Sequence, residues 1–184
     1  MADDRAPDGT GFRRLMGRWA TGVSVVTAHH GTADAGLTVN ALLSVALQPP
    51  SLLVSLTRDA DTVPVLEASG AFGVSFLAAD QRQLSERFAS TLPPPEKFRD
   101  VPFHRGALGV ALLDGALGWA ECRVVARTER YDHLLFVGEV ARQALGRDVD
   151  PLLFYRSGYA EAVGNGRLRL PGSRGPDAPP APPR

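Results

Sequence analysis

Small polar side chains interrupt the most apolar stretch of the chain, GLTVNALLSVALQPPSLLVSL at residues 36–56. Thr38, Asn40 and Ser44 stand at even separations, so a regular strand would place all three on one face. If they are buried, each needs a hydrogen-bond partner, because an unpaired polar group costs about 1–3 kcal/mol. Barrel turns supply such partners. A large planar ligand with a rim of carbonyls, ring nitrogens and a phosphate supplies them too, and the residues alone leave both explanations open.

A second group of residues, just downstream, favours phosphate binding. Arg58 and Thr62 flank the start of a short predicted helix that follows Asp61. Backbone N–H groups, the helix dipole and a guanidinium together attract an anion. An exposed arginine beside a capped helix explains the same residues, so this pattern also has two interpretations.

The other potentially reactive residues give weaker evidence for a functional site. His29-His30 fits a solvated turn better than a metal site, because no further ligands stand at a recognisable spacing, and we expect no metal. Cys122 lies in an alternating strand and is expected to be a buried, unreactive thiol. Asp132-His133 suggests a hydrolase, but the chain has no G-x-S-x-G motif. It also has no P-loop and no G-x-G-x-x-G that opens a helix.

Length and charge limit the class of protein. The 184 residues fit one domain, and lysine plus arginine equal aspartate plus glutamate at 20 each. The absence of a block of like charge argues against a nucleic-acid or membrane-surface protein. No apolar run approaches the ~20 residues that span a bilayer, and the first residues lack the pattern of a signal peptide. We expect a cytoplasmic protein with no nucleic-acid or membrane partner.

Hydrophobic periodicity predicts short strands and few helices. Helices are expected at 12–22, 62–70 and 81–89, the last two capped by Asp61 and Asp80. Loops are expected at 29–36 and 92–110. Strands are expected at 23–28, 36–46, 51–57, 71–77, 115–128, 133–145 and 151–162, with Pro49-Pro50 breaking the ladder between the second and third. Without βαβ alternation, this pattern favours a mostly antiparallel β-barrel with peripheral helices.

Composition divides the chain into three parts. Residues 1–11 are expected to form a flexible N-terminal arm, and 12–165 the domain. Residues 166–184, which include PGSRGPDAPPAPPR, are rich in proline and glycine and are expected to be a disordered tail.

The stretch at 36–56 closely resembles the flavin-binding signature of the flavin reductase-like family, the reductase components of two-component flavin-dependent monooxygenases. The similarity runs in the same order from about Phe12 to Ala162, through FRRLMGRWATGVSVVTA, DQRQLSERFA, EKF at 96–98, LLDGALGWAECRV, YDHLLFVGEV and PLLFYRSGY. The resemblance implies a mostly β fold, a split antiparallel β-barrel (Greek-key-like) with a few peripheral helices, and a homodimer.

The resemblance also implies a function and a site. The chain would be an NAD(P)H:flavin oxidoreductase that reduces FAD or FMN by hydride transfer from NADH or NADPH and supplies diffusible reduced flavin to a partner monooxygenase. His133 would be the catalytic residue, near the nicotinamide. Since the cofactors perform hydride transfer themselves, we expect no protein nucleophile. The implied cofactor-binding residues are Thr38, Val39, Asn40, Ala41, Ser44, Ser55, Thr57, Arg58, Asp61, Thr62, Lys97, Phe98 and Tyr159.

One residue departs from the family pattern. Tyr131 stands where the family has a glycine, directly before Asp132 and His133. Its ring either points outward from the turn or narrows the nicotinamide entrance. Two alternatives therefore stay open: a flavin-bound oxidase or dehydrogenase that acts directly on a small organic substrate, and a carrier that binds flavin or haem without turnover.

Overall fold

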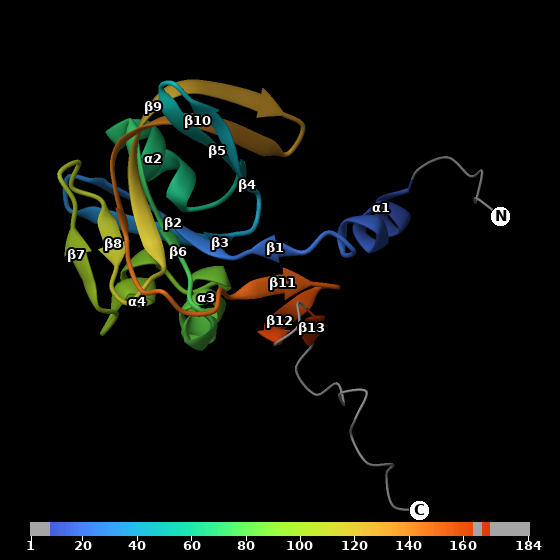
Figure 1. The fold of residues 1–184 in the computed structure, drawn as a ribbon. Helices are drawn as coiled ribbons and strands as arrows, with labels where there is room; N and C mark the ends of the chain where they lie inside the picture. The colour runs from blue at the N-terminus through green and yellow to red at the C-terminus, as the bar shows by residue number, and fades with distance from the viewer. Residues whose placement is uncertain (1–7, 164–166, 170–184) are drawn as a thin grey trace, which may run out of the picture.

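The computed structural model describes residues 8–163 and 167–169 and is built around a curled, seven-stranded antiparallel sheet (Figure 1). The sheet has the strand order β3-β2-β6-β9-β10-β5-β4. Its strands are β2 (Ser24–His30), β3 (Ala33–Val39), β4 (Leu42–Leu47), β5 (Pro50–Thr57), β6 (Ala71–Phe76), β9 (Gly118–Arg130) and β10 (His133–Leu145). The described residues form no ladder between the end strands β3 and β4, so the barrel does not close.

Smaller elements surround this sheet. Strands β1 (Thr21–Gly22), β11 (Leu153–Tyr155), β12 (Gly158–Val163) and β13 (Arg167–Arg169) form a second sheet, and β7 (Phe103–Arg105) pairs with β8 (Ala111–Leu113). The helices are α1 (Gly9–Met16), α2 (Thr62–Ser69), α3 (Arg82–Ala89), α4 (Pro94–Phe98) and the 3₁₀ turn η1 (Ala79–Gln81). The prediction of a mostly β fold with few peripheral helices is confirmed. None of the described helices is long and apolar enough to cross a membrane.

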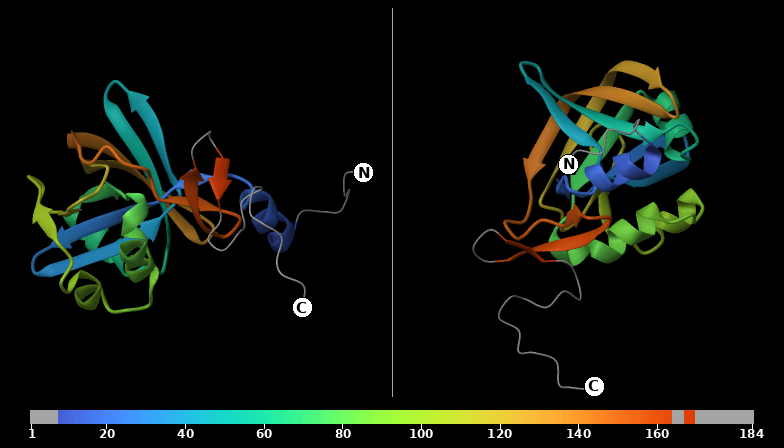
Figure 2. Two further views of the ribbon diagram at one scale, coloured as in Figure 1. Left: turned by 60° about the horizontal axis from the view of Figure 1, so that its bottom comes forward. Right: turned by 90° about the vertical axis from the view of Figure 1, so that its right-hand side faces the viewer.

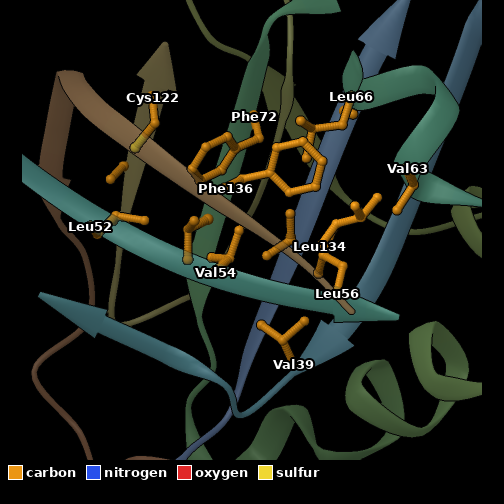
Figure 3. Close-up of a cluster of buried hydrophobic side chains, with 14 residues drawn as sticks. Val39, Leu52, Val54, Leu56, Val63, Leu66, Phe72, Cys122, Leu134 and Phe136 are labelled. Carbon is orange, nitrogen blue, oxygen red and sulfur yellow. The ribbon is translucent and has the colours of Figure 1, made fainter. Parts of the chain in front are cut away.

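The core lies inside the curl of the sheet, where helix α2 closes one end (Figure 3). Strand β5 forms where a strand is expected, and its side chains alternate, with Leu52, Val54 and Leu56 directed inward. Strand β6 was expected to be half-buried, but Ala71–Ser75 are buried on both faces. The second face is covered by β8, whose Leu113 N–H donates to the Ser75 hydroxyl at 3.0 Å.

The N-terminal helix differs from the prediction. Helix α1 begins at Gly9, where the Asp8 carboxylate accepts from the Gly11 N–H at 2.6 Å, and ends at Met16 rather than continuing to residue 22. It stops because the chain then extends into β1, in which Thr21 pairs with Phe154. Part of the expected arm is therefore helical, while residues 1–7 lie outside the described residues. No residue of α1 is buried, and Figure 2 shows the helix projecting from the sheet.

Several expected loops contain regular structure. Residues 29–36 form the turn end of the β2–β3 hairpin, whose turn is at Gly31 (φ 61°), a conformation that glycine adopts freely. The expected loop at 92–110 contains α4 and β7, and the expected strand at 151–162 is the β11–β12 hairpin. The tail was expected from residue 166, but Arg167–Arg169 form β13 and pair with β12. Residues 170–184 lie outside the described residues.

The two predicted N-cap aspartates do not cap by side-chain hydrogen bonds. Asp61 occupies the N-cap position of α2, but its side chain accepts no capping hydrogen bond. Asp80 lies within η1, one residue before the cap position of α3, and pairs instead with Arg147 at 2.7 Å. Asp80 therefore ties η1 to the segment after β10.

Candidate functional site

The chain breaks its strand at Asn40-Ala41, between β3 and β4. A register shift between Ser44 and Ala46 then bends β4 against β5. The prediction that Thr38, Asn40 and Ser44 share one face of a single strand is therefore wrong. The break separates Ser44 from the other two side chains: Asn40 lines two of the clefts described below, one of them together with Thr38, and Ser44 lines a different one.

The largest of these clefts has a volume of about 720 Å³, which is within the usual range for small-molecule sites. Three of the predicted residues line it: the exposed Asn40 and Ala41 and the half-buried Ser55. The remaining lining is mainly apolar and includes Trp19, a residue that sequence reasoning did not select. A planar ring with a polar rim fits such a lining, because the apolar residues contact its faces and the polar ones its edge.

A smaller cleft of about 190 Å³ brings together Thr38, Val39, Asn40 and Tyr159. The Thr38 hydroxyl donates to the Ser85 carbonyl at 2.7 Å, and the Ser85 hydroxyl lies 2.8 Å from the Tyr159 hydroxyl. Buried Ser85 thus connects β3, α3 and β12, although nothing in the local sequence marks it. Ser44 lines a third cleft of about 570 Å³, together with Leu47 and Leu145.

The predicted phosphate residues lie where β5 ends and α2 begins. Thr57 and Arg58 are exposed, and Thr62 is buried in the first turn of α2. The Arg58 guanidinium donates from Nη1 to Glu129 at 2.6 Å and from Nη2 to the Tyr131 carbonyl at 2.9 Å. The sequence does not reveal Glu129, because it is 71 positions from Arg58 and reaches it only through the β9–β10 hairpin.

Lys97 and Phe98 come from α4, which packs on β3. The Lys97 side chain is buried, and its Nζ donates to the Phe88 carbonyl at 3.2 Å, near the C-terminus of α3. Burial lowers the pKa of Lys97, and the negative charge of Asp61 partly opposes this shift. Phe98 stacks edge-on against Phe88, with 5.1 Å between ring centroids. The structure therefore gives both residues a clear role in packing, with Asp61 close enough to act on the lysine.

His133 opens β10, directly opposite Thr57 of β5. Its Nδ1 lies 2.8 Å from an Asp132 carboxylate oxygen, and this hydrogen bond is the largest cause of the lowered pKa of Asp132. Tyr131 has a φ of 57° and is 92% exposed, so its ring points away from the molecule, and among the described residues it lines none of the three clefts above. The left-handed backbone also explains why a glycine suits this position.

Two further groups belong to the framework. The His29 Nδ1 lies 3.0 Å from Asp34, and Arg105 donates to both oxygens of that carboxylate at 2.6 Å. The described residues contain no group of three His, Cys, Asp or Glu side chains that could hold a metal ion. Cys122 is buried as expected, and burial, with a smaller effect of Glu121, raises its pKa to about 12.

Comparison with known proteins gives a consistent result. Residues 16–162 match the flavin reductase like domain. The chain is 36% identical over 152 residues to the reductase component of 4-hydroxyphenylacetate 3-monooxygenase from Thermus thermophilus, which covers 83% of this chain and 95% of that protein. It is 40% identical over 151 residues to the NADH-dependent flavin reductase of a Rhodococcus species, covering 80% of this chain and 83% of that one.

A solved structure supports the same assignment. The NADH:FAD oxidoreductase SgcE6 of Streptomyces globisporus C-1027, solved in complex with NAD and FAD fragments, superimposes with a TM-score of 0.80 at 31% identity. The match covers 87% of this chain and 96% of that one. The chain therefore belongs to the flavin reductase-like family.

Proposed function

We infer that the protein is an NADH-dependent flavin reductase, which reduces FAD or FMN and supplies the reduced flavin to a partner monooxygenase. The observation that carries this inference is the family match over residues 16–162, which contains all of the predicted site residues. Relatives named as NADH-dependent flavin reductases and as reductase components match over most of their own length, so the likeness extends beyond a shared fragment.

The site residues fit a flavin. The cleft of about 720 Å³ offers apolar walls with Asn40 and Ser55 at its edge, as an isoalloxazine ring requires. Beyond Ser55, strand β5 leads to Arg58 and the start of α2, where a guanidinium and helix donors suit a phosphate. The binding set that we propose is Thr38, Val39, Asn40, Ala41, Ser44, Ser55, Thr57, Arg58, Asp61, Thr62, Lys97, Phe98 and Tyr159.

The chemistry requires positioning more than reactive side chains. A bound flavin supplies a hydride acceptor, so the protein has to hold the nicotinamide against it in the correct orientation and exclude water. We assign this orienting role to His133, because the hydrogen bond with Asp132 orients its imidazole ring, and within the described part of the chain no residue bonds its Nε2. No nucleophile is needed, in agreement with the buried, protonated state of Cys122.

The test is NADH oxidation by the purified protein, followed by the loss of NADH absorbance with FAD, with FMN and without added flavin. We expect turnover that depends on added flavin, and the flavin with the higher kcat/KM is the physiological one. Protein that binds flavin but oxidises neither NADH nor NADPH would contradict the assignment. A tightly retained flavin and turnover of an organic substrate would support the alternative of a direct oxidase, which no observation favours.

We also propose a homodimer. Large apolar side chains lie exposed on two surfaces: Leu47, 84% exposed, and Leu145, 97% exposed, border the cleft of about 570 Å³, while Phe12 and Leu15 lie on α1. Exposed apolar patches of this kind mark protein–protein interfaces. A second copy covers both surfaces at once, since a two-fold interface presents the same elements from each side. We place the reaction in the cytoplasm, where NADH and the proposed monooxygenase partner meet.

A further inference from the structure

Arg58, the proposed phosphate ligand, is already held by the β9–β10 turn. Its side chain donates to the Glu129 carboxylate at 2.6 Å and to the Tyr131 carbonyl at 2.9 Å. Its backbone N–H donates to the Asp132 carbonyl at 2.9 Å. The strand register explains this arrangement, because Leu134 of β10 lies between Leu56 of β5 and Glu129 of β9. A phosphate that takes the Nη1 hydrogen bond of Arg58 must therefore compete with a carboxylate of the same chain.

The ion pair between Arg58 and Glu129 is of a kind that a competing anion can break easily. The pair joins one nitrogen to one oxygen, and the side chains of Arg58 and Glu129 are 56% and 45% exposed. By contrast, Arg105 binds both oxygens of Asp34, whose side chain is 21% exposed. Exposed monodentate pairs contribute little to stability, whereas a phosphate adds more charge and can accept helix N–H groups as well. A phosphate can thus displace Glu129, but at a reduced net affinity.

We propose that Glu129 competes with the flavin phosphate for Arg58 and thereby weakens flavin binding. The inference rests on the proposed flavin site and adds a residue that limits affinity. A reductase that passes its product to another enzyme must release it, and a competing carboxylate beside the phosphate speeds that release. Glu129 acts through Arg58 and does not contact the reacting atoms.

The experiment compares Glu129→Gln with the unchanged protein by fluorescence titration with FMN and with riboflavin, which differ only in the phosphate. Glutamine keeps the size of the side chain but removes the competing charge. We expect the Kd for FMN to fall about two- to fivefold, as expected from the loss of an exposed ion pair, with a slower off-rate. The Kd for riboflavin should stay unchanged, which a general structural effect would not produce.

Glu67→Gln is the matched control. Glu67 pairs with Arg127 at the same distance of 2.6 Å and at similar exposure, so this variant removes the same charge from an equivalent pair. It should leave both dissociation constants unchanged. An unchanged Kd for FMN in Glu129→Gln, or an equal change for both flavins, would overturn the role of Glu129 while leaving the reductase function intact. Failure of the unchanged protein to bind FMN, riboflavin or, in the same titration, FAD would overturn both proposals.

Discussion

At the scale of single residues, substitution of His133 gives the most direct test of the proposed hydride transfer from NADH to flavin. The Asp132 carboxylate orients its ring, so replacing it should disturb the docking of nicotinamide more than that of flavin. We predict that His133→Ala slows reduction by NADH by at least about tenfold, because loss of orientation alone has effects of this size or more. Stopped-flow reduction and flavin titration measure the two effects separately.

His104→Ala is the control for that change. His104 makes the same contact with an aspartate, Asp114, at 2.8 Å, but it lies on β7 and is not one of the predicted site residues. Its removal should affect neither rate nor affinity. Reduction by NADH that stays as fast in His133→Ala as in the unchanged protein would remove His133 from the mechanism.

Replacing Tyr131 by the family's glycine tests what the tyrosine does at this position. A non-glycine residue in the left-handed region is strained, and this ring gains no burial in return. We predict that Tyr131→Gly raises the free energy of unfolding by about 0.5–1 kcal/mol, the relief of strain exceeding the added freedom of the unfolded chain. Urea denaturation measures it, and KM for NADH should not change.

The matched change is Thr128→Gly, at a half-buried position of strand β9 that pairs with Leu135, and it should instead lower the free energy of unfolding, because glycine weakens a strand interior. If Tyr131→Gly altered KM for NADH several-fold, the ring would have to reach the nicotinamide site, and the outward orientation would be wrong for the working enzyme.

At the scale of elements, the ion pair between Asp34 and Arg105 joins the β2–β3 hairpin to the β7–β8 hairpin. Burial by itself would raise the pKa of Asp34, but the hydrogen bond and charge of Arg105, with a smaller effect of His29, lower it overall. The pair therefore stabilises the fold above the unfolded pKa of about 3.8 and is lost as pH falls through the lower folded value.

We predict that Asp34→Asn lowers the free energy of unfolding at pH near 7 by about 1–3 kcal/mol, the contribution of hydrogen bonds to a charged group. Near pH 3 the difference from the unchanged protein should shrink, because the Asp34 carboxyl of the unfolded chain is protonated below about 3.8, whereas the native one has a lower pKa. Urea denaturation at both values measures this, with exposed Asp59→Asn as control. A difference that did not vary with pH would show that the charge is not responsible.

The elements also show which features a sequence can and cannot predict. Strands such as β5 follow from alternation, since Leu52, Val54 and Leu56 face one core. The break at Asn40-Ala41 could not be read in the same way, because a polar residue within an apolar run fits a buried strand and a turn equally. Contacts such as Arg58 with Glu129 depend on the register of three strands, which no local pattern specifies.

At the scale of the whole molecule, the proposed homodimer can be tested by mutation of the exposed apolar surfaces. We predict that Leu47→Glu converts a dimer into a monomer, because a charge buried at an interface without a partner is strongly unfavourable. Sedimentation velocity measures the mass, and circular dichroism checks that the fold is retained, which we expect since Leu47 is exposed within the single chain.

Val149→Glu is the matched change at another exposed apolar residue, one that does not border the cleft of about 570 Å³. It should leave the mass of the dimer unchanged. If the unchanged protein were itself a monomer at micromolar concentration, the interface that we propose would be wrong.

The burial of Cys122 affects how well the enzyme resists oxidation during turnover. Reduced flavin that escapes into aerated solution reacts with oxygen and yields hydrogen peroxide, an oxidant of thiolates. Because burial raises its pKa to about 12, the only cysteine of the chain stays protonated, and therefore unreactive, at neutral pH. Packed against Phe72 and Gly138, it is also out of reach. The fold thus keeps its one thiol inert toward the by-product of its own reaction.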